Sequence, residues 1–318
     1  MFCSPLTLSN KGVLGMNKRN VHYISRYNPR NRYKLVDDKL ITKRLAQEAG
    51  IAVPGLLGVV STPREIADIY ALFNGEPGFV IKPAQGSGGK GIIVITDVRE
   101  GRFYKSNDEE IVKHHIEDHV ANILGGLFTL GGHTDVAMVE NLIKFDPIFE
   151  GYSYEGVPDV RLIVFKGFPV MGMLRLSTHA SDGKANLHQG AVGVGLDVAT
   201  GRSLGAVQFD QAIAEHPDTG KPLKNIQVPH WDRLLDLAAG CYEMSGLGYL
   251  GTDMVLDVDQ GPLLLELNAR PGLAIQMANR QGLLPRLKQV ETLKNAHKMT
   301  ASERINYIKM HFASDILI

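Results

Sequence analysis

The stretch from Gly251 to Gly272, GTDMVLDVDQGPLLLELNARPG, most constrains the fold of this chain. TDMVLDV and PLLLELN are short β-prone runs, and DQG between them is typical of a turn, so the stretch predicts a β-hairpin. A loop centred on Asp259 and Gln260 places Asp253 directly opposite Glu266 when residues are counted outward along the two strands. Two like charges that face each other destabilise a hairpin unless a cation lies between them.

The sequence of the second strand indicates that this acidic pair binds a cation. Glu266 interrupts the run Leu263 to Leu267, which is otherwise apolar on both faces of the strand and is therefore expected to be buried. Asn268 lies two residues further on and points to the same side, where it adds a neutral oxygen. Asp253, Glu266 and Asn268 thus form a candidate Mg²⁺ site. A hairpin with a merely solvated polar face is the alternative.

Composition narrows the class of protein. The chain has 318 residues, 44% of them hydrophobic, and equal numbers of basic and acidic residues at 34 each, so it lacks the global charge of a general nucleic-acid binder. A local basic stretch, Lys18 to Arg44, could meet an anionic substrate or simply be a solvated face. Cys3 and Cys241 form no metal or redox spacing, and neither a signal peptide nor an 18-residue apolar run is evident. We therefore expect a cytoplasmic, soluble protein without a membrane span.

A glycine-rich loop in KPAQGSGGKGIIVIT is the second informative feature. Several backbone N–H groups of such a loop can surround one phosphate, and Lys82 adds positive charge. A dinucleotide-binding fingerprint must open a helix, whereas this loop leads into the β-prone run Ile92 to Thr96, and the P-loop pattern fails at Ala84 and Gly91. We therefore predict a β-hairpin lid over phosphate, with a plain surface turn as the alternative. The lid residues are Gly86, Ser87, Gly88, Gly89, Lys90 and Gly91.

Other segments of the chain contain further candidate site residues. We expect a helix over 108–124, where His115 and His119 have the i, i+4 spacing of a zinc pair but lack the glutamate of H-E-x-x-H and a third ligand. A strand over 136–143 could serve as a hinge between lobes. The strand 159–165 places Asp159 and Arg161 on one face. Arg175 ends the following strand, and the helix Trp231 to Ser245 presents a buried apolar stripe.

Seven motifs, taken in order, resemble those of the ATP-grasp superfamily of carboxylate-amine ligases. They are DDKLITKRLAQEAGIAVP, FVIKPAQGSGGKGIIVI, VENLI, DVRLIVF, NLHQGA, GTDMVLD and LELNARPGL. NLHQGA and the LELNARPGL ending look most like the α-L-glutamate ligase-like members, which include the enzymes that modify ribosomal protein S6. The resemblance spans roughly residues 37 to 284.

The resemblance implies an α+β ATP-grasp fold with two α+β lobes that clamp ATP. Together with the residue patterns at the two ends, it gives four segments: an N-terminal arm or cap at 1–35, an N-lobe with the lid at 36–138, a C-lobe with the Mg²⁺ site at 139–290, and a C-terminal helix at 291–318. Relatives usually carry a substantial α/β domain ahead of the first lysine, whereas residues 1–38 precede Lys39 here. We therefore expect that a partner subunit or a second copy of the chain could complete the substrate site.

The resemblance also assigns roles to residues. ATP would be held by Lys39 and Lys82 at the phosphates, by the lid, and by the hinge residues Glu140, Asn141, Leu142 and Ile143 at the adenine. Mg²⁺, or Mn²⁺ in its place, would be held by Asp253, Glu266 and Asn268. The reacting carboxylate and phosphate would face Arg161, Arg175, Asn186 and Arg270.

The implied reaction joins a carboxylate to an amine through an acyl phosphate. Glutamate is the default amino acid, and the carboxylate acceptor could be a small molecule or the C-terminus of a peptide or protein. One alternative is an ATP-grasp module that binds nucleotide without catalysis. A kinase is a weaker alternative, because Lys82 precedes the glycine loop and both H-R-D and D-F-G are absent.

Overall fold

The computed structural model describes residues 4–86 and 88–314, and the chain divides into two compact units. The larger unit consists of Met1–Asp37, Ile41–Ala52 and Phe145–Ile318. The smaller unit consists of Asp38–Leu40 and Val53–Lys144. Within the described residues, no helix is long and apolar enough to cross a membrane.

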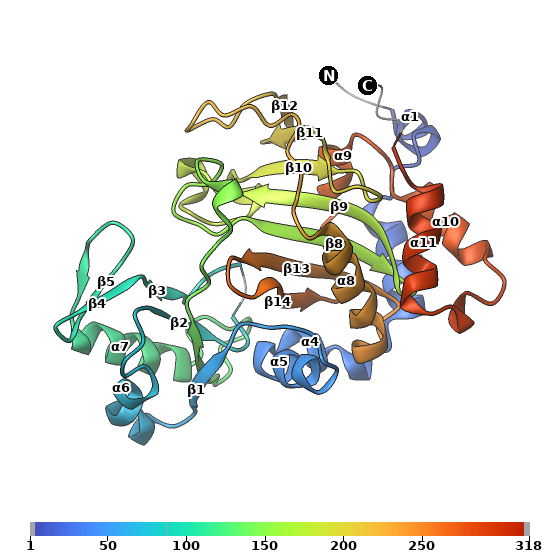
Figure 1. Cartoon of the computed structure of the whole chain (residues 1–318). Helices are drawn as coiled ribbons and strands as arrows, with labels where there is room; N and C mark the ends of the chain where they lie inside the picture. Colours follow the sequence, from blue (N-terminus) through green and yellow to red (C-terminus); the bar gives the residue numbers. More distant parts are fainter. Residues whose placement is uncertain (1–3, 87, 315–318) are drawn as a thin grey trace. The chain divides into compact units, whose positions relative to one another are not determined.

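A seven-stranded antiparallel sheet forms the centre of the larger unit (Figure 1). Its strand order is β12-β11-β10-β9-β8-β13-β14. Most of β8, β9, β10 and β13 is buried on both faces, which explains their nearly continuous apolar sequences. The strands are β8 (Asp159–Phe165), β9 (Phe168–Leu176), β10 (Val192–Leu196), β11 (Ser203–Gln208), β12 (Gln211–Ile213), β13 (Tyr249–Asp257) and β14 (Gly261–Asn268).

Helices surround this sheet. The longest, α8, begins at Trp231 and ends at Ser245, as its apolar stripe predicts. A capping box formed by Thr300 and Glu303 begins α11. The other helices associated with this unit are α1 (Pro5–Asn10), α2 (Met16–Lys18), α3 (Ser25–Tyr27), α4 (Lys34–Asp37), α5 (Lys39–Glu48), α9 (Ile275–Asn279), α10 (Leu284–Thr292) and α11 (Ala301–His311). Short 3₁₀ or π segments cover Arg19–Ile24, Arg30–Arg32, Pro147–Phe149, His179–Ser181, Leu187–Gln189 and Ala296–Lys298.

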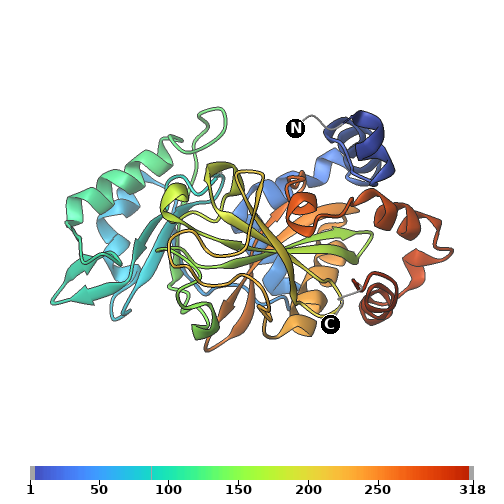
Figure 2. The same cartoon turned by 90° about the horizontal axis from the view of Figure 1, so that it is seen from above.

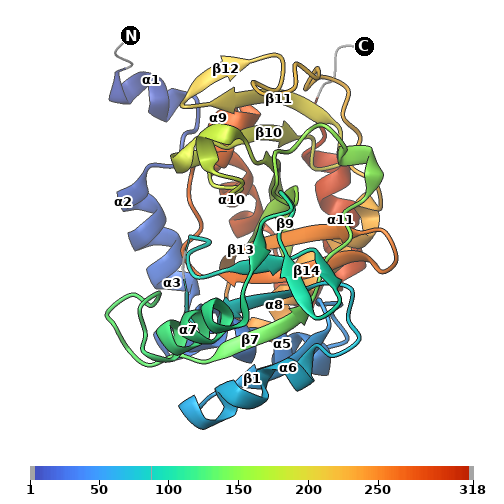
Figure 3. The ribbon, with the colours of Figure 1, turned by 90° about the vertical axis from the view of Figure 1, so that its left-hand side faces the viewer.

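The N-terminal segment folds against the larger unit. Its helices α1, α2 and α3 follow one another along one edge of that unit (Figure 3), and α1 lies beside α10 when viewed from above (Figure 2). The backbone N–H of Leu284 donates to the carbonyl of Gly12 at 3.1 Å. Asn28 is buried and bonds the backbone of Tyr249 in both directions. These bonds tie a polar, weakly periodic segment to the sheet.

The smaller unit is built on a four-stranded antiparallel sheet in the order β1-β7-β2-β3. Its core combines Ile81 and Val139 from the sheet with Ile116 and Val120 from α7. The elements are β1 (Leu56–Val60), a 3₁₀ segment (Pro63–Asp68), α6 (Ile69–Leu72), β2 (Phe79–Pro83), β3 (Ile93–Ile95), β4 (Asp97–Arg99), β5 (Arg102–Tyr104), β6 (Glu110–Ile111), α7 (Lys113–Leu124) and β7 (Ala137–Asn141). Strands β4, β5 and β6 form a separate three-stranded sheet.

The start of one helix differs from its prediction. The helix expected from Asp108 begins instead at Lys113, because Glu110 and Ile111 pair with β5 as the short strand β6. Asp108 has a left-handed backbone with φ of 60°, which is incompatible with helix continuation. The apolar pattern predicted helix α7 correctly, but the pairing of β6 with β5 moves its start from Asp108 to Lys113.

Two glycines of the lid hairpin share a left-handed backbone but differ in how closely a side chain packs against them. Gly88 and Gly91 both have positive φ, at 65° and 76°, but a Cβ at Gly88 would meet open space whereas one at Gly91 would lie 2.5 Å from the Phe128 ring. We expect Gly91→Ala to destabilise the smaller unit by about 1–3 kcal/mol more than the matched variant Gly88→Ala, because only the first adds a steric overlap to the backbone strain. Urea denaturation followed by circular dichroism measures the difference. Equal midpoints for the two variants would contradict the packing of Gly91 against Phe128.

Candidate active site

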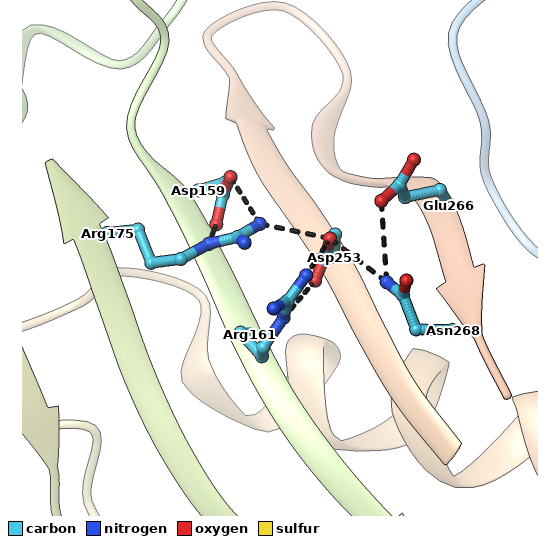
Figure 4. A network of polar contacts seen from close by, with 6 residues as sticks. All are labelled: Asp159, Arg161, Arg175, Asp253, Glu266 and Asn268. Atoms are coloured by element: carbon cyan, nitrogen blue, oxygen red, sulfur yellow. Dashed lines mark hydrogen bonds and ion pairs between the residues drawn. The ribbon is translucent and has the colours of Figure 1, made fainter. Parts of the chain in front are cut away.

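Four neighbouring strands present charged side chains on one face of the large sheet (Figure 4). Arg175 on β9 lies opposite Asp159 on β8, and Arg161 on β8 lies opposite Asp253 on β13. Asp253 lies in turn opposite Glu266 on β14. Directly opposed residues in an antiparallel pair extend to the same face, so register alone brings these side chains together.

The arginines bind the aspartates in a continuous ladder of ion pairs. Arg175 makes a two-pronged contact with Asp159, with Nε–Oδ1 at 2.5 Å and Nη2–Oδ2 at 2.7 Å. Its Nη2 also lies 3.0 Å from Oδ2 of Asp253. Arg161 makes a second two-pronged contact with Asp253, at 2.7 and 2.5 Å. Asp253 is therefore shared by two guanidinium groups, and each arginine is fixed in orientation.

Burial makes these charges interact strongly. Asp159, Arg175 and Asp253 are respectively 6%, 9% and 2% exposed. Burial raises the pKa of Asp159 to about 6, against the lowering effect of Arg175. Burial would also raise the pKa of Asp253, but Arg161 and Arg175 outweigh it and hold that pKa below its usual range. Asp253 therefore stays ionised at neutral pH.

The predicted opposition of Asp253 and Glu266 is confirmed, although the turn that was expected to produce it is different. Asp257 pairs with Gly261, so the loop contains three residues instead of the two predicted at Asp259 and Gln260. A register shift between Asp253 and Met254 then restores the predicted pair. A β-bulge of this kind inserts one extra residue, which offsets the extra residue in the turn.

The oxygen atoms of this cluster suit a hard divalent cation. Nδ2 of Asn268 lies 3.3 Å from Oδ2 of Asp253 and 3.3 Å from Oε1 of Glu266, so the amide sits between the two carboxylates. Rotation of that amide by 180° presents its oxygen to the same point, and three oxygen ligands then converge. The residues therefore fit Mg²⁺. Asp253 would share its oxygens between the cation and the two arginines.

Two other predicted residues are engaged outside this ladder. Oδ1 of Asn186 accepts the backbone N–H of His188 at 3.0 Å and caps a 3₁₀ turn in the NLHQGA segment. Arg270 is exposed, donates to Asp37 at 3.1 Å and lies over the ring of Tyr33. Their assignment to the reacting groups stays a prediction.

The smaller unit carries the predicted nucleotide-binding lysines. Lys82 on β2 forms an ion pair with Glu140 on β7 at 2.6 Å, and both side chains are buried. The ammonium of Lys39 donates to the carbonyl of Gly86 at 2.5 Å, so this lysine is tied to the first glycine of the lid. These contacts place each lysine firmly, and their roles toward phosphate stay predictions.

The lid is a β-hairpin, as predicted, because β2 and β3 flank it and pair antiparallel. Gly88, Gly89 and Gly91 have left-handed φ values between 65° and 76°, which glycine adopts at little cost. Lys90 is exposed, and Ser87 lies outside the described residues. The ring of His119 on α7 contacts the carbonyl of Gly91 at 2.9 Å, so this histidine supports the lid.

The predicted hinge residues lie where β7 ends. Asn141 is the last residue of β7, and its side-chain amide donates to Glu76 at 3.1 Å. Leu142 and Ile143 follow the strand and are half-buried. A separate cavity of about 650 Å³ in the smaller unit is lined by Gln85 and Asp135 among others, and none of the predicted nucleotide-binding residues that the structure describes lines it.

Comparison with known families shows that the chain is an ATP-grasp protein. The chain belongs to the sugar-transfer associated ATP-grasp family, whose model matches residues 18–292. The narrower resemblance to glutamate ligase-like members is not confirmed by that match. Among curated proteins, none matches the chain.

Several solved structures are similar to this chain at low sequence identity. D-cycloserine synthetase DcsG has 16% identity and a TM-score of 0.49, over 94% of this chain and 83% of its own. D-alanyl-alanine synthetase A from Vibrio cholerae has 10% identity and a TM-score of 0.47, over 88% and 67%. The ATP-grasp ligase PsnB has 16% identity and a TM-score of 0.46, over 83% and 61%. The match thus spans about three fifths of the PsnB chain, and the family assignment rests on the family model.

Sequence reasoning missed the part that Asp159 plays in this cluster. Its position on one face with Arg161 was predicted, but its two-pronged contact with Arg175 depends on the pairing of β8 with β9. The available signal was a carboxylate at the start of DVRLIVF, a run that is apolar apart from Asp159 and Arg161, because a carboxylate in such a run calls for a cationic partner.

Asp159 therefore offers a test of the ladder. Asp159→Asn should lower the free energy of unfolding by about 3 kcal/mol, near the lower end for removing one partner of a buried pair, because Arg175 keeps Asp253. Asp182→Asn is the matched control, since Asp182 also pairs with a cation, Lys184, but is 89% exposed in its side chain. Urea denaturation followed by the fluorescence of Trp231, the sole tryptophan, reports on the larger unit. Similar small effects of the two substitutions would contradict a buried ladder.

Proposed function

We propose that the chain is an ATP-dependent ligase that joins a carboxylate to an amine through an acyl phosphate. One observation carries this proposal: β8, β9, β13 and β14 place two arginines and an oxygen cluster on one face of the sheet in a member of an ATP-grasp family. The arginines suit anionic substrates, and the oxygen cluster suits the cation that accompanies ATP.

The first step activates the acid. A carboxylate oxygen attacks the γ-phosphorus of ATP, the bond to the bridging oxygen breaks, and ADP leaves. Catalysis of such a transfer consists mainly of positioning and of neutralising charge on phosphate oxygens. Mg²⁺ or Mn²⁺, held by Asp253, Glu266 and Asn268, would supply part of that neutralisation.

The second step forms the amide. The amine nitrogen attacks the carbonyl carbon of the acyl phosphate, the C–O bond to phosphate breaks, and inorganic phosphate leaves. Starting from a protonated amine, one proton is released over the whole reaction. The tetrahedral intermediate is anionic, so a fixed cationic donor beside it lowers the barrier.

Each arginine of the ladder retains a donor for this purpose. Nε and Nη2 of Arg161 and Arg175 contact carboxylates, whereas Nη1 of neither arginine forms a hydrogen bond or ion pair within the described residues. An arginine that is fixed by two-pronged contacts needs no further ordering when its remaining nitrogen meets substrate. We assign Arg161 and Arg175 to the carboxylate and phosphate, with Asn186 and Arg270 as further contributors.

The smaller unit would hold the nucleotide. Lys39 and Lys82 supply charge for its phosphates, the backbone N–H groups of 86–91 cover them, and residues 140–143 meet the adenine. Closure of the lid would exclude water that hydrolyses the acyl phosphate.

The reaction belongs in the cytoplasm, with glutamate as the reference amine, and the acceptor acid could be a peptide or protein C-terminus. A partner subunit or second copy could complete its binding site.

Glu266 tests the metal assignment. Glu266→Gln should reduce ADP release by about 10²-fold or more, because it removes one of the two charged ligands for the cation. Asp259→Asn, on the exposed turn of the same hairpin, is the control and should retain activity. The assay screens paired acids and amines with Mg-ATP and identifies the products by mass spectrometry. Wild-type turnover in Glu266→Gln would exclude this carboxylate from the site, and tight Mg-ATP binding without turnover of any pair would favour a non-catalytic module.

Lys82 tests the nucleotide assignment. Lys82→Ala should weaken ATP binding by about tenfold or more, as expected for loss of a charge-assisted contact to phosphate. Lys105→Ala is the matched control, because Lys105 also pairs with a glutamate in the smaller unit but is more exposed. Isothermal titration calorimetry measures both, with circular dichroism to verify folding. An unchanged ATP Kd in folded Lys82→Ala would remove this lysine from the site.

A further inference from the structure

Positive charge is concentrated at the start of the chain. Residues 1–36 contain seven lysines and arginines and no aspartate or glutamate, although basic and acidic residues are equal in number over the whole chain. The remaining residues therefore carry seven more acidic than basic side chains. Such a separation of charge between two parts of a chain predicts an anionic partner for the basic part when its side chains face solvent.

The helical segment made of α2, the π turn after it and α3 turns basic side chains outward. Lys18, His22 and Arg26 recur at every fourth residue, which places them along one side of the segment, and all three are exposed. The side chains of Lys18 and His22 form neither a hydrogen bond nor an ion pair within the described residues. Arg26 lies 3.8 Å from Glu291, with 67% of its own side chain exposed, so this pair is weak. The charge on this side is open to a partner.

The other side of the same segment fixes it to the larger unit. Tyr23 is buried and Tyr27 is half-buried, and the ring of each lies edge-on to Phe165 of β8, with centroid distances of 5.5 and 4.9 Å. The hydroxyl of Tyr27 donates to Glu291 of α10 at 2.7 Å. Because the aromatic side holds the segment in place, its basic side needs little further ordering when a partner binds.

Exposed apolar side chains accompany this charge. Leu6, Leu8, Met16 and Val21 are 71%, 41%, 63% and 64% exposed. Val21 lies three residues after Lys18 and therefore on the same side of the helical segment. Helix α1 buries none of its six residues, and a helix this short is not stable in water through its own hydrogen bonds. Its leucines are thus displayed to solvent without a partner among the described residues.

The chain is anchored directly after α1. Leu14 is buried, and its backbone N–H and carbonyl both bond the side-chain amide of Gln276, at 2.8 and 3.1 Å. Gly12 has a φ of 69° and packs so closely that a Cβ there would lie 2.5 Å from Pro285. Helix α1 and the exposed Lys11 are presented next to this anchor, along the same edge of the larger unit as α2 and α3 (Figure 3).

This mixture of side chains fits a lipid surface better than a nucleic acid. An anionic bilayer attracts basic side chains through its surface potential and takes aliphatic side chains into the boundary between head groups and acyl chains. Single-stranded nucleic acids are bound through stacking on aromatic rings, and a duplex is bound mainly through its phosphates. The described tyrosines of this part of the chain are not exposed, since Tyr23 is buried and Tyr27 and Tyr33 are half-buried.

We propose that residues 4–26 form a docking surface for an anionic lipid bilayer. The chain lies on the bilayer without crossing it, and within the described residues no helix is able to span a membrane. The cytoplasmic leaflet is anionic, which agrees with a cytoplasmic location of the reaction. The inference does not depend on the ligase chemistry. The residues that enter the head-group region are Leu6, Leu8, Met16 and Val21, and those that meet lipid phosphates are Lys11, Lys18 and Arg26.

Co-sedimentation of the full chain with vesicles tests the proposal. One set of vesicles consists of phosphatidylcholine alone, and the other contains about 30% phosphatidylglycerol. We expect binding to the anionic vesicles to be at least about tenfold tighter at about 0.1 M NaCl and to weaken at about 0.5 M NaCl, because salt screens the lysines and arginines from the lipid charge. Equal binding to the two sets, or binding to neither, would overturn the proposal.

A charge-reversed variant locates the binding. The double variant Lys11→Glu/Lys18→Glu should bind anionic vesicles about tenfold more weakly or worse, because two attractive charges become repulsive. Arg64→Glu/Lys224→Glu is the matched control, since both residues are exposed, one lies in each unit, and the change in net charge is the same. Thermal unfolding verifies that both variants fold. An equal loss in the control would overturn the proposal, because it would show that only net charge matters.

An apolar-to-polar variant separates insertion from charge alone. Leu6→Ser/Met16→Ser should also weaken binding to anionic vesicles by about tenfold or more, from lost burial of two aliphatic side chains. Leu130→Ser/Met310→Ser is the control, because these residues are 81% and 76% exposed elsewhere on the chain. Unchanged binding in folded Leu6→Ser/Met16→Ser would overturn the docking surface as proposed.

A short DNA duplex separates lipid from nucleic acid as the partner. Fluorescence anisotropy with a labelled duplex should show weaker binding than the anionic vesicles give under the same salt conditions. Tighter binding of the duplex, lost in Lys11→Glu/Lys18→Glu, would overturn the proposal in favour of a nucleic-acid site.

Discussion

Carboxylates on neighbouring strands can be buried in ionised form on one face of a sheet only when positive charge lies between them. The large sheet meets this condition with a ladder in which Arg175 joins Asp159 to Asp253 and Arg161 also forms an ion pair with Asp253. Asp159, Asp253 and Glu266 carry three negative charges against the two of the arginines, so the cluster keeps a net charge of −1. This residual charge, together with the oxygens around Asn268, favours a cation beside anionic substrates.

The same principle operates on a smaller scale in the other unit. Lys82 and Glu140 form a buried pair on adjacent strands of a separate sheet, and Lys39 is fixed to the first glycine of the lid. Charged groups are thus fixed by opposite charges or carbonyls before any substrate arrives. Such preorganisation reduces the ordering cost of binding and directs the remaining donors to one side. These buried ion pairs fix the positions of the charged groups but add little stability, because a buried ion pair is seldom a strong source of folding free energy.

Much of the fold was predictable from local pattern, whereas parts of the site depended on pairing between distant strands. The opposition of Asp253 to Glu266 was predicted from hairpin counting, and it holds because a bulge offsets a turn one residue longer than expected. Turn length and bulges respond to neighbouring strands, so they cannot be counted from one hairpin. The Asp159–Arg175 contact required the β8–β9 register, and the contact of Asp253 with Arg161 required the pairing of β13 with β8. The periodicity of apolar residues within one strand does not show which residues of other strands will lie beside it.

A crystal structure with Mn²⁺ and a non-hydrolysable ATP analogue tests the central claim most directly. Mn²⁺ takes the same oxygen ligands as Mg²⁺ and is located by its anomalous scattering. We expect an anomalous peak within coordination distance of carboxylate oxygens of Asp253 and Glu266 and of the analogue's phosphates, with Arg161 still bound to Asp253. Bound nucleotide with its Mn²⁺ away from both carboxylates would contradict the account.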